Sequence, residues 1–193
     1  MSYCNRIISS ILAGMFIAIG CLVYTKQPNI IGAILFSFGL ISVILLKLDL
    51  YTGKVGFMQL QDFLPILCIL IGNLIGAIFL SCFQPDVSTI VSAKLILSPM
   101  QIFLRAYLCG MIIYTLVAVK KPIFCLIGVP LFILSGAEHS IADAAYFFAD
   151  GLTLPAINFL IIAILGNAFG SITLHRALET KNDKNNSNQK NRL

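Results

Sequence analysis

Residues 63–83 read FLPILCILIGNLIGAIFLSCF, a run of 21 residues that contains no charged side chain. A helix needs about 20 apolar residues to cross roughly 30 Å of hydrocarbon, so this run predicts a transmembrane helix. The whole sequence is 59% hydrophobic and only 11% charged, which excludes an ordinary soluble domain. Further apolar runs lie on both sides of this one, and the six expected spans are residues 7–24, 30–46, 63–83, 102–119, 123–148 and 152–174.

A short pattern inside this run occurs twice in the chain. Residues 72–77 read GNLIGA and residues 166–171 read GNAFGS, which is the same Gly-Asn-x-x-Gly-small pattern 94 residues later. Small residues let helices approach closely in lipid, so we expect both segments to serve helix packing. Each half of the chain holds three spans, an odd number, so the second half must cross the membrane in the opposite direction. The sequence therefore predicts two inverted repeats, at about 1–90 and 91–176.

Charged residues interrupt the second and fifth spans. The sequence KLDLYTGK occupies residues 47–54, and GAEHSIAD occupies residues 136–143. Ionisable groups at membrane depth are costly unless they face a cavity or a partner. We therefore expect both spans to be broken helices, with Gly53, Gly56 and Gly136 supplying the backbone freedom that the breaks need.

Several charged side chains near these breaks are expected to have structural roles. Asp49 and Glu138, which lie 89 residues apart, are predicted to cap or pin the backbone at the two breaks. Lys47 and Arg105 are predicted to lie at span ends, where long side chains reach the interface.

Most lysines and arginines fall on one side of the predicted spans. With a cytoplasmic N-terminus, nine of them lie in inner loops or the C-terminal tail, against Lys26 and Lys94 outside. This bias predicts that both termini are cytoplasmic. Residues 177–193 are rich in Lys and Asn with almost nothing apolar, so we expect a disordered basic cytoplasmic tail after a channel domain at 1–176.

Several of these segments together resemble the formate/nitrite transporter family of anion channels, over about residues 6–176. The resemblance is carried by the two Gly-Asn-x-x-Gly segments, by DLYTG at 49–53, by LCGM at 108–111 and by GAEHSIAD at 136–143. It implies an all-α membrane protein with an aquaporin-like fold, a pore through each protomer and a homopentameric assembly in the cell (inner) membrane.

The resemblance also implies pore residues. Thr52 matches a threonine that faces the pore histidine, here His139, and Lys94 matches a lysine of the outer vestibule. Gly110 stands where the family often has Asn, which would remove one polar group from the pore. Apolar constrictions are implied on both sides of the histidine, formed by Phe36 and Leu40 on one side and by Leu50, Tyr51 and Phe132 on the other.

Elementary electrostatics gives these residues a role. Moving an ion through an apolar constriction costs on the order of 10 kcal/mol or more, whereas a neutral weak acid can pass. Lys94 would raise the local anion concentration, and Thr52 could hydrogen-bond to the imidazole or the solute. His139 either donates a proton or only polarises the anion while a proton arrives through water. Asp143 is expected to support the helix, because a carboxylate facing an anion path would repel the anion.

The favoured function is a channel or transporter for small weak-acid anions such as formate, nitrite or hydrosulfide, without metal or cofactor and without a nucleic-acid partner. One alternative is a neutral-solute pore of aquaporin or glycerol type, which is disfavoured because paired Asn-Pro-Ala segments are absent. The other is a membrane enzyme that uses Glu138, His139 and Asp143. The remaining histidine, His175, lies at the far end of the last span, so a multi-histidine metal site is not expected.

Overall fold

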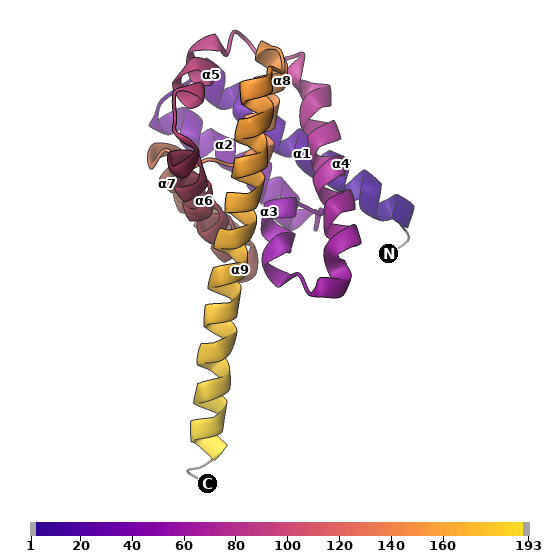
Figure 1. Cartoon of the computed structure of the whole chain (residues 1–193), viewed down its shortest axis with the longest axis vertical. Coiled ribbons are helices and arrows are strands. Elements are labelled where there is room, and N and C mark those ends of the chain that lie inside the picture. The colour runs from indigo at the N-terminus through magenta and orange to yellow at the C-terminus, as the bar shows by residue number, and fades with distance from the viewer. Residues whose placement is uncertain (1–2, 191–193) are drawn as a thin grey trace.

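The computed structural model describes residues 3–190, and the side chains of residues 5–182 apart from that of residue 60. The described residues form nine α-helices and two short 3-10 helices, which confirms an all-helical fold (Figure 1). The 3-10 helices are η1 (Val55–Phe57) and η2 (Leu60–Asp62). The α-helices are α1 (Tyr3–Lys26), α2 (Ile30–Leu45), α3 (Tyr51–Lys54), α4 (Phe63–Ser81), α5 (Ser88–Leu95), α6 (Pro99–Val119), α7 (Pro122–Leu134), α8 (Ser140–Asp150) and α9 (Leu154–Lys190).

Local signals in the sequence explain several helix starts. The side chain of Asn29 accepts the N–H groups of Ile31 and Gly32 at the start of α2. Ser98 accepts the N–H of Gln101 at the start of α6, and a proline occupies the first turn, where no N–H is needed. These caps satisfy donors that the first turn of a helix leaves unpaired.

Four helical segments are long and apolar enough to cross a membrane. They are Asn5–Lys26, Phe63–Ser81, Pro99–Val119 and Leu154–Asn182. The expected run 30–46 corresponds to α2 alone, and α3 begins after it, separated from α2 by residues 46–50. The expected run 123–148 covers most of two shorter helices, α7 and α8, which residues 135–139 separate.

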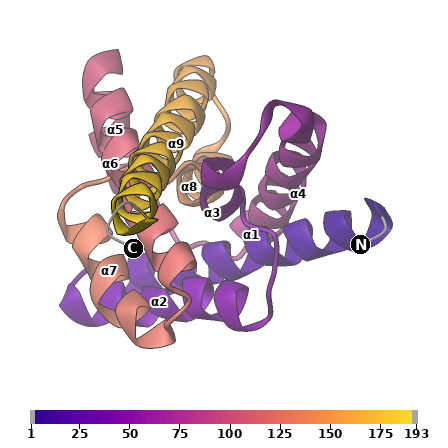
Figure 2. The ribbon, with the colours of Figure 1, turned by 90° about the horizontal axis from the view of Figure 1, so that it is seen from below.

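The helices pack in a defined set of pairs. α1 packs against α4 and α2, α6 packs against α9, and α2 packs against α7. The two short helices α3 and α8 lie inside this arrangement: α3 contacts α4, α6 and α9, and α8 contacts α1, α4, α5 and α9 (Figure 2). Every residue from Ser140 to Phe147 of α8 is buried. A buried short helix therefore follows each interruption.

Glycines allow the tightest of these contacts. A Cβ atom at Gly76 would lie 2.0 Å from the carbonyl oxygen of Ile11, and one at Gly170 would lie 2.0 Å from that of Tyr107. No side chain fits at such distances, so glycine is required where α4 meets α1 and where α9 meets α6. This agrees with the packing role expected of the Gly-Asn-x-x-Gly segments.

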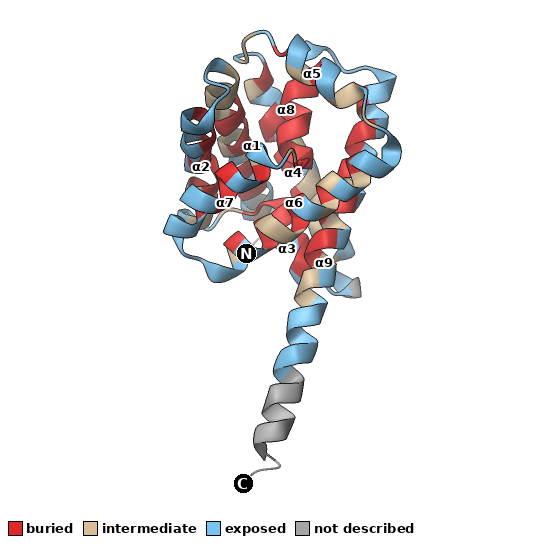
Figure 3. Cartoon of the chain, turned by 90° about the vertical axis from the view of Figure 1, so that its left-hand side faces the viewer, coloured by how far each residue is buried: buried red, intermediate tan, exposed pale blue. Residues whose placement is uncertain are grey.

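The outer surface of the protomer is apolar. Many large aliphatic and aromatic side chains are exposed, among them Leu64 at 68% and Ile127 at 70%. Exposed residues occur along most of the outer helices (Figure 3). A water-soluble monomer rarely exposes so much contiguous apolar surface. Such a surface suits lipid or neighbouring protomers.

The expected disordered tail differs from the structure. α9 continues as a helix to Lys190 and projects beyond the other helices (Figure 1), while residues 191–193 lie outside the described part. Elongation of a helix already nucleated in the packed region adds a hydrogen bond for each residue fixed. An ion pair of 3.2 Å between His175 and Glu179, one turn apart, adds support where α9 leaves the bundle.

Candidate functional site

The interruption before α3 is held by one buried asparagine. The side-chain oxygen of Asn73 accepts the N–H of Tyr51 at 2.7 Å. Its amide nitrogen donates to the carbonyl oxygens of Ser10 at 2.7 Å and Asp49 at 2.9 Å. Asn73 therefore replaces hydrogen bonds that the interrupted helix cannot make within itself.

The interruption before α8 is held in the same way. The side-chain oxygen of Asn167 accepts the N–H of Ser140 at 2.9 Å, and its amide nitrogen donates to the carbonyl oxygens of Ala106 and Glu138, both at 2.8 Å. Asn73 and Asn167 are fully buried. The sequence predicted only a packing role for the segments that contain them. The signal that could have identified them was an amide recurring inside two apolar runs, because a buried amide requires partners.

The chain also turns alike at the two interruptions. Lys47 and Gly136, which are 89 residues apart, both take left-handed backbone conformations, with φ of 55° and 67°. At each turn, the N–H of the left-handed residue donates to the carbonyl of the third residue before it, Ile44 or Ile133. The N–H of the following residue donates to the carbonyl of the fifth residue before itself. Lys47, expected as an interfacial charge, is therefore the backbone counterpart of Gly136.

Two other glycines do not have the role predicted for them. Only Gly136 of the three predicted break glycines has a positive φ. Gly53 lies within α3, where a Cβ atom would come 2.8 Å from the side chain of Val117, and a Cβ at Gly56 would come 2.6 Å from Tyr114. These two glycines provide space for neighbouring side chains and do not supply the turn.

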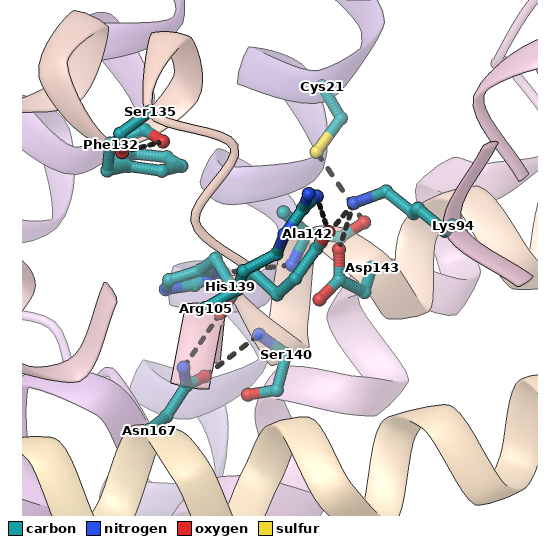
Figure 4. Close-up of polar contacts among 11 residues, drawn as sticks. Cys21, Lys94, Arg105, Phe132, Ser135, His139, Ser140, Ala142, Asp143 and Asn167 are labelled. Atoms are coloured by element: carbon teal, nitrogen blue, oxygen red, sulfur yellow. Dashed lines mark hydrogen bonds and ion pairs between the residues drawn. The ribbon is translucent and has the colours of Figure 1, made fainter. Parts of the chain in front are cut away.

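His139 lies at the junction of the two halves. It is the N-cap of α8, and its Nδ1 accepts the N–H of Ala142 at 3.2 Å (Figure 4). Its Nε2 lies 2.9 Å from Oγ1 of Thr52 in α3. Because Nδ1 accepts, the ring proton of the neutral imidazole resides on Nε2 and is donated to Thr52. The hydroxyl of Thr52 then keeps its own proton for another acceptor.

A cavity of about 270 Å³ opens beside His139. The rings of Phe36 and Phe132 meet edge to face in its wall, with centroids 5.8 Å apart, and the ring of Phe132 lies 6.1 Å from that of His139. The residues that line this cavity include Phe36, Lys94, Arg105, Phe132, Glu138, His139 and Asp143.

The predicted grouping of the constriction residues is wrong in part. Phe132 pairs with Phe36 and not with Leu50, because the turn after α7 places the end of that helix against α2. Leu50 lines a second cavity of about 490 Å³, and Leu40 is buried in the same apolar cluster as Leu50. Tyr51 packs in a separate cluster, and its hydroxyl donates to a carbonyl of α9 at 3.2 Å. The second cavity is lined by Val43, Ile44, Leu45, Lys47, Leu48, Leu50, Gly53, Lys54, Val117 and Lys120.

Lys94 is held between two carboxylates in the first cavity. Its ammonium contacts the carboxylate of Glu138 and lies 2.8 Å from Oδ1 of Asp143, while Nη1 of Arg105 lies 3.9 Å from Oε1 of Glu138. Burial would lower the pKa of Lys94, but Asp143 and Glu138 raise it above its ordinary value, so the side chain stays an ammonium. Lys94, expected in an outer vestibule, is therefore paired with two carboxylates.

The two break acids do not cap the backbone through their carboxylates. In Glu138 and in Asp49 it is the main-chain carbonyl that bonds to the asparagine. The carboxylate of Asp49 instead pairs with Lys54 at 3.2 Å, and its N–H donates to Ser9. The carboxylates of the two acids thus form ion pairs with lysines, and the side chains of the asparagines form the hydrogen bonds that stabilise the breaks.

Two further positions gain a structural explanation. Arg105, expected as an interfacial charge, lines the first cavity beside Glu138. A Cβ atom at Gly110 would lie 2.2 Å from the carbonyl oxygen of Asn167, so this position faces α9 closely. Glycine at 110 therefore serves the contact of α6 with α9, and the missing pore amide is not its explanation.

Comparisons with known proteins agree with the sequence motifs. The sequence model described as "Formate/nitrite transporter" matches residues 1–179. A solved structure titled "FNT family ion channel" has a TM-score of 0.78 and 22% identity, covering 89% of this chain and 87% of that one. Another, "Pentameric formate channel with formate bound", has a TM-score of 0.74 and 19% identity, covering 93% and 95%. No curated protein matches the sequence. At these identities the two structures establish a shared fold.

Proposed function

Because the chain belongs to the formate/nitrite transporter family, as its sequence motifs predicted, we propose that it conducts small monovalent weak-acid anions across the cell (inner) membrane. The fold is shared with a channel whose title names bound formate, so formate is the first substrate to test. Nitrite and hydrosulfide have the same charge and similar size.

The proposed architecture has six spans in two inverted repeats. α2 with α3, and α7 with α8, would each form one interrupted span beside the four long helices. The matching contacts of Asn73 and Asn167, 94 residues apart, support the repeat, as do the matching turns 89 residues apart. The similar fold of a pentameric channel and the apolar exterior support a homopentamer with a pore in each protomer. The distribution of Lys and Arg supports cytoplasmic termini.

The proposed path connects the two cavities through the contact of His139 with Thr52. This contact carries the proposal, because it is the polar link between the two interruptions and is buried on both sides. Phe36 and Phe132 would form the constriction on the side of the first cavity. Leu50 would form it on the other side, with Leu40 behind it.

Of the two roles left open for His139, the geometry favours polarisation. To act as a net acid, the imidazole must first take a second proton on Nδ1. That nitrogen accepts the N–H of Ala142 at the N-terminus of α8, where the helix dipole disfavours positive charge. His139 would therefore stay neutral and polarise the solute through Nε2 and the Thr52 hydroxyl, while the proton arrives from elsewhere.

Uptake into proteoliposomes tests this function. The wild-type protein is expected to take up formate faster as the pH falls from about 8 to about 5, because more neutral acid becomes available. Glycerol swelling should not exceed that of empty liposomes, and formate uptake no faster than through empty liposomes would refute the proposal. Faster glycerol entry would favour the aquaporin-type alternative.

Two substitutions test the path. His139→Asn keeps a good N-cap for α8 but removes the imidazole, and Thr52→Val removes the hydroxyl with little change of shape. Both are expected to slow formate uptake by about tenfold or more, which corresponds to about 1.4 kcal/mol. His175→Asn, in α9 where that helix leaves the bundle, is the matched control. Wild-type rates in both pore variants would show that the solute takes another route.

The membrane-enzyme alternative has less support. The two acids it would use are engaged with Lys94, and one nitrogen of the histidine is engaged with the backbone.

A further inference from the structure

Three charged side chains in the first cavity form a cluster that the proposed function leaves unused. Lys94 of α5 contacts the carboxylates of both Glu138 and Asp143, and we call these three residues the acid–lysine triad. The carboxylates are almost fully buried, with side-chain exposures of 4% for Glu138 and 2% for Asp143. All three residues line the cavity beside His139. Figure 4 shows the contact of Lys94 with Asp143.

The triad has one more acid than base. With both carboxylates ionised, it would bear a net negative charge in a buried site. Two carboxylates that share one cation in a buried site resist ionising together, so such a site favours binding a proton.

The contacts indicate which carboxyl holds the proton. Glu138 has a second cation near it, because Arg105 lies 3.9 Å from Oε1. The other carboxyl oxygen of Asp143, Oδ2, is buried and has no hydrogen-bond partner among the described residues. A buried ionised oxygen without a donor is costly, whereas a protonated carboxyl carries no charge. Asp143 is therefore the acid with less support for its ionised form.

Arg105 of α6, whose side chain is 43% exposed, is a cation that a surrounding element brings near the triad, and its contact is with Glu138 and not with Asp143. The other ionisable groups that interact with Asp143 are the thiols of Cys21 in α1 and Cys109 in α6 and the phenol of Tyr146 in α8. Thiols and phenols are neutral in their ordinary state near neutral pH. α4 and α9 also contact α8, but the sequence of α4 contains only one ionisable side chain, a thiol, and α9 has none before His175.

We propose that the acid–lysine triad holds one exchangeable proton on Asp143 and transfers it to the incoming anion. This inference rests on the proposed function. Asp143 would be the source of the proton that His139 does not supply. In the step, an O–H bond of the Asp143 carboxyl breaks and an O–H bond forms on the anion. The products are the neutral acid and an Asp143 carboxylate paired with Lys94. A hydronium ion from the outer solution then reprotonates Asp143, so one proton crosses with each anion.

Substitution of Asp143 tests the transfer. Asp143→Asn keeps the size of the side chain but cannot donate a carboxyl proton. Formate uptake is expected to fall about tenfold or more at about pH 8, where solution protons are scarce, and to stay within about twofold of wild type at about pH 5. Asp143→Glu should restore the wild-type pH profile. Asp150→Asn, an exposed acid at the end of the same helix, is the matched control.

Infrared spectroscopy of the purified pentamer gives a second readout that does not depend on transport. A protonated carboxyl has a carbonyl stretching band that a carboxylate lacks, and we expect this band in the wild-type protein near neutral pH and its loss in Asp143→Asn. An unchanged pH profile in Asp143→Asn overturns the inference, as does the absence of the band from the wild-type protein. Should Asp143→Asn fail to assemble, the wild-type band alone decides. Failure of the proposed function is distinguishable, because wild-type protein would then take up no formate whatever the band shows.

Discussion

Replacing Asn167 by alanine should remove three buried hydrogen bonds at once. Its amide nitrogen donates to two carbonyls at 2.8 Å, and its oxygen accepts the N–H of Ser140 at 2.9 Å. A typical bond contributes about 1 kcal/mol, and a buried partner left unpaired costs about 1–3 kcal/mol. With partial relaxation around the site, we expect the free energy of unfolding to fall by about 3–6 kcal/mol. That is a large part of the about 5–15 kcal/mol that stabilises a typical protein.

Equilibrium unfolding in mixed micelles of mild detergent and dodecyl sulfate measures this loss through the helical circular-dichroism signal. Asn73→Ala is expected to lose a similar amount, because Asn73 makes the same three kinds of bond. Asn158→Ala, an exposed change in the same helix as Asn167, should lie within about 0.5 kcal/mol of wild type. A loss below about 1 kcal/mol for Asn167→Ala would refute the conclusion that this side chain supports the interruption before α8.

Three further predictions concern the left-handed turns, the contact of α6 with α9 and the paired rings of Phe36 and Phe132. Both Lys47 and Gly136 have left-handed backbone conformations, which glycine adopts most easily. Lys47→Gly should therefore raise the free energy of unfolding by about 1 kcal/mol in the same assay, and Gly136→Ala should lower it by about 1 kcal/mol. Changes of the same sign in the two variants would contradict the matched turns. Gly110→Asn should lower the yield of assembled protein on gel filtration, since its Cβ would lie 2.2 Å from a carbonyl oxygen of α9, and a normal yield would show that α6 and α9 separate easily. Phe132→Ala should admit glycerol in swelling assays by removing one of two paired rings, whereas retained exclusion would place the constriction elsewhere.

The sequence predicted the features that depend on local pattern. The apolar runs predicted the positions of the four long apolar helices. The charges in KLDLYTGK and GAEHSIAD lie at or beside the segments that separate α2 from α3 and α7 from α8. The approach of Thr52 to His139 was also expected, although only through family resemblance. These features could be predicted because burying a charge or exposing a long apolar run is costly wherever it occurs.

Other features depend on partners far away in the sequence. Lys94 could be assigned to a vestibule but not to two carboxylates 44 and 49 residues later, since the short helix α5 has no pattern that fixes its position. Phe132 was grouped with the wrong residues for the same reason, because its neighbour Phe36 belongs to another helix. A lysine at a left-handed position, such as Lys47, also runs against the usual preference for glycine.

The charge balance of the first cavity would allow acids to line the proposed anion path. Asp143 was expected to support the helix because a carboxylate facing an anion path would repel the anion. Its carboxyl lies against Lys94 and near Glu138, which Arg105 also approaches. With all four side chains ionised the cluster is neutral, whereas a proton on Asp143 makes it positive by one unit. The protonated cluster would therefore attract an anion, and transfer of the proton would return the cluster to neutrality at the moment when the solute becomes neutral too. The electrostatic attraction between the cluster and the solute would therefore end when the neutral acid has to move past the rings of Phe36 and Phe132. The same carboxyl would thus contribute both to binding the anion and to releasing the neutral acid.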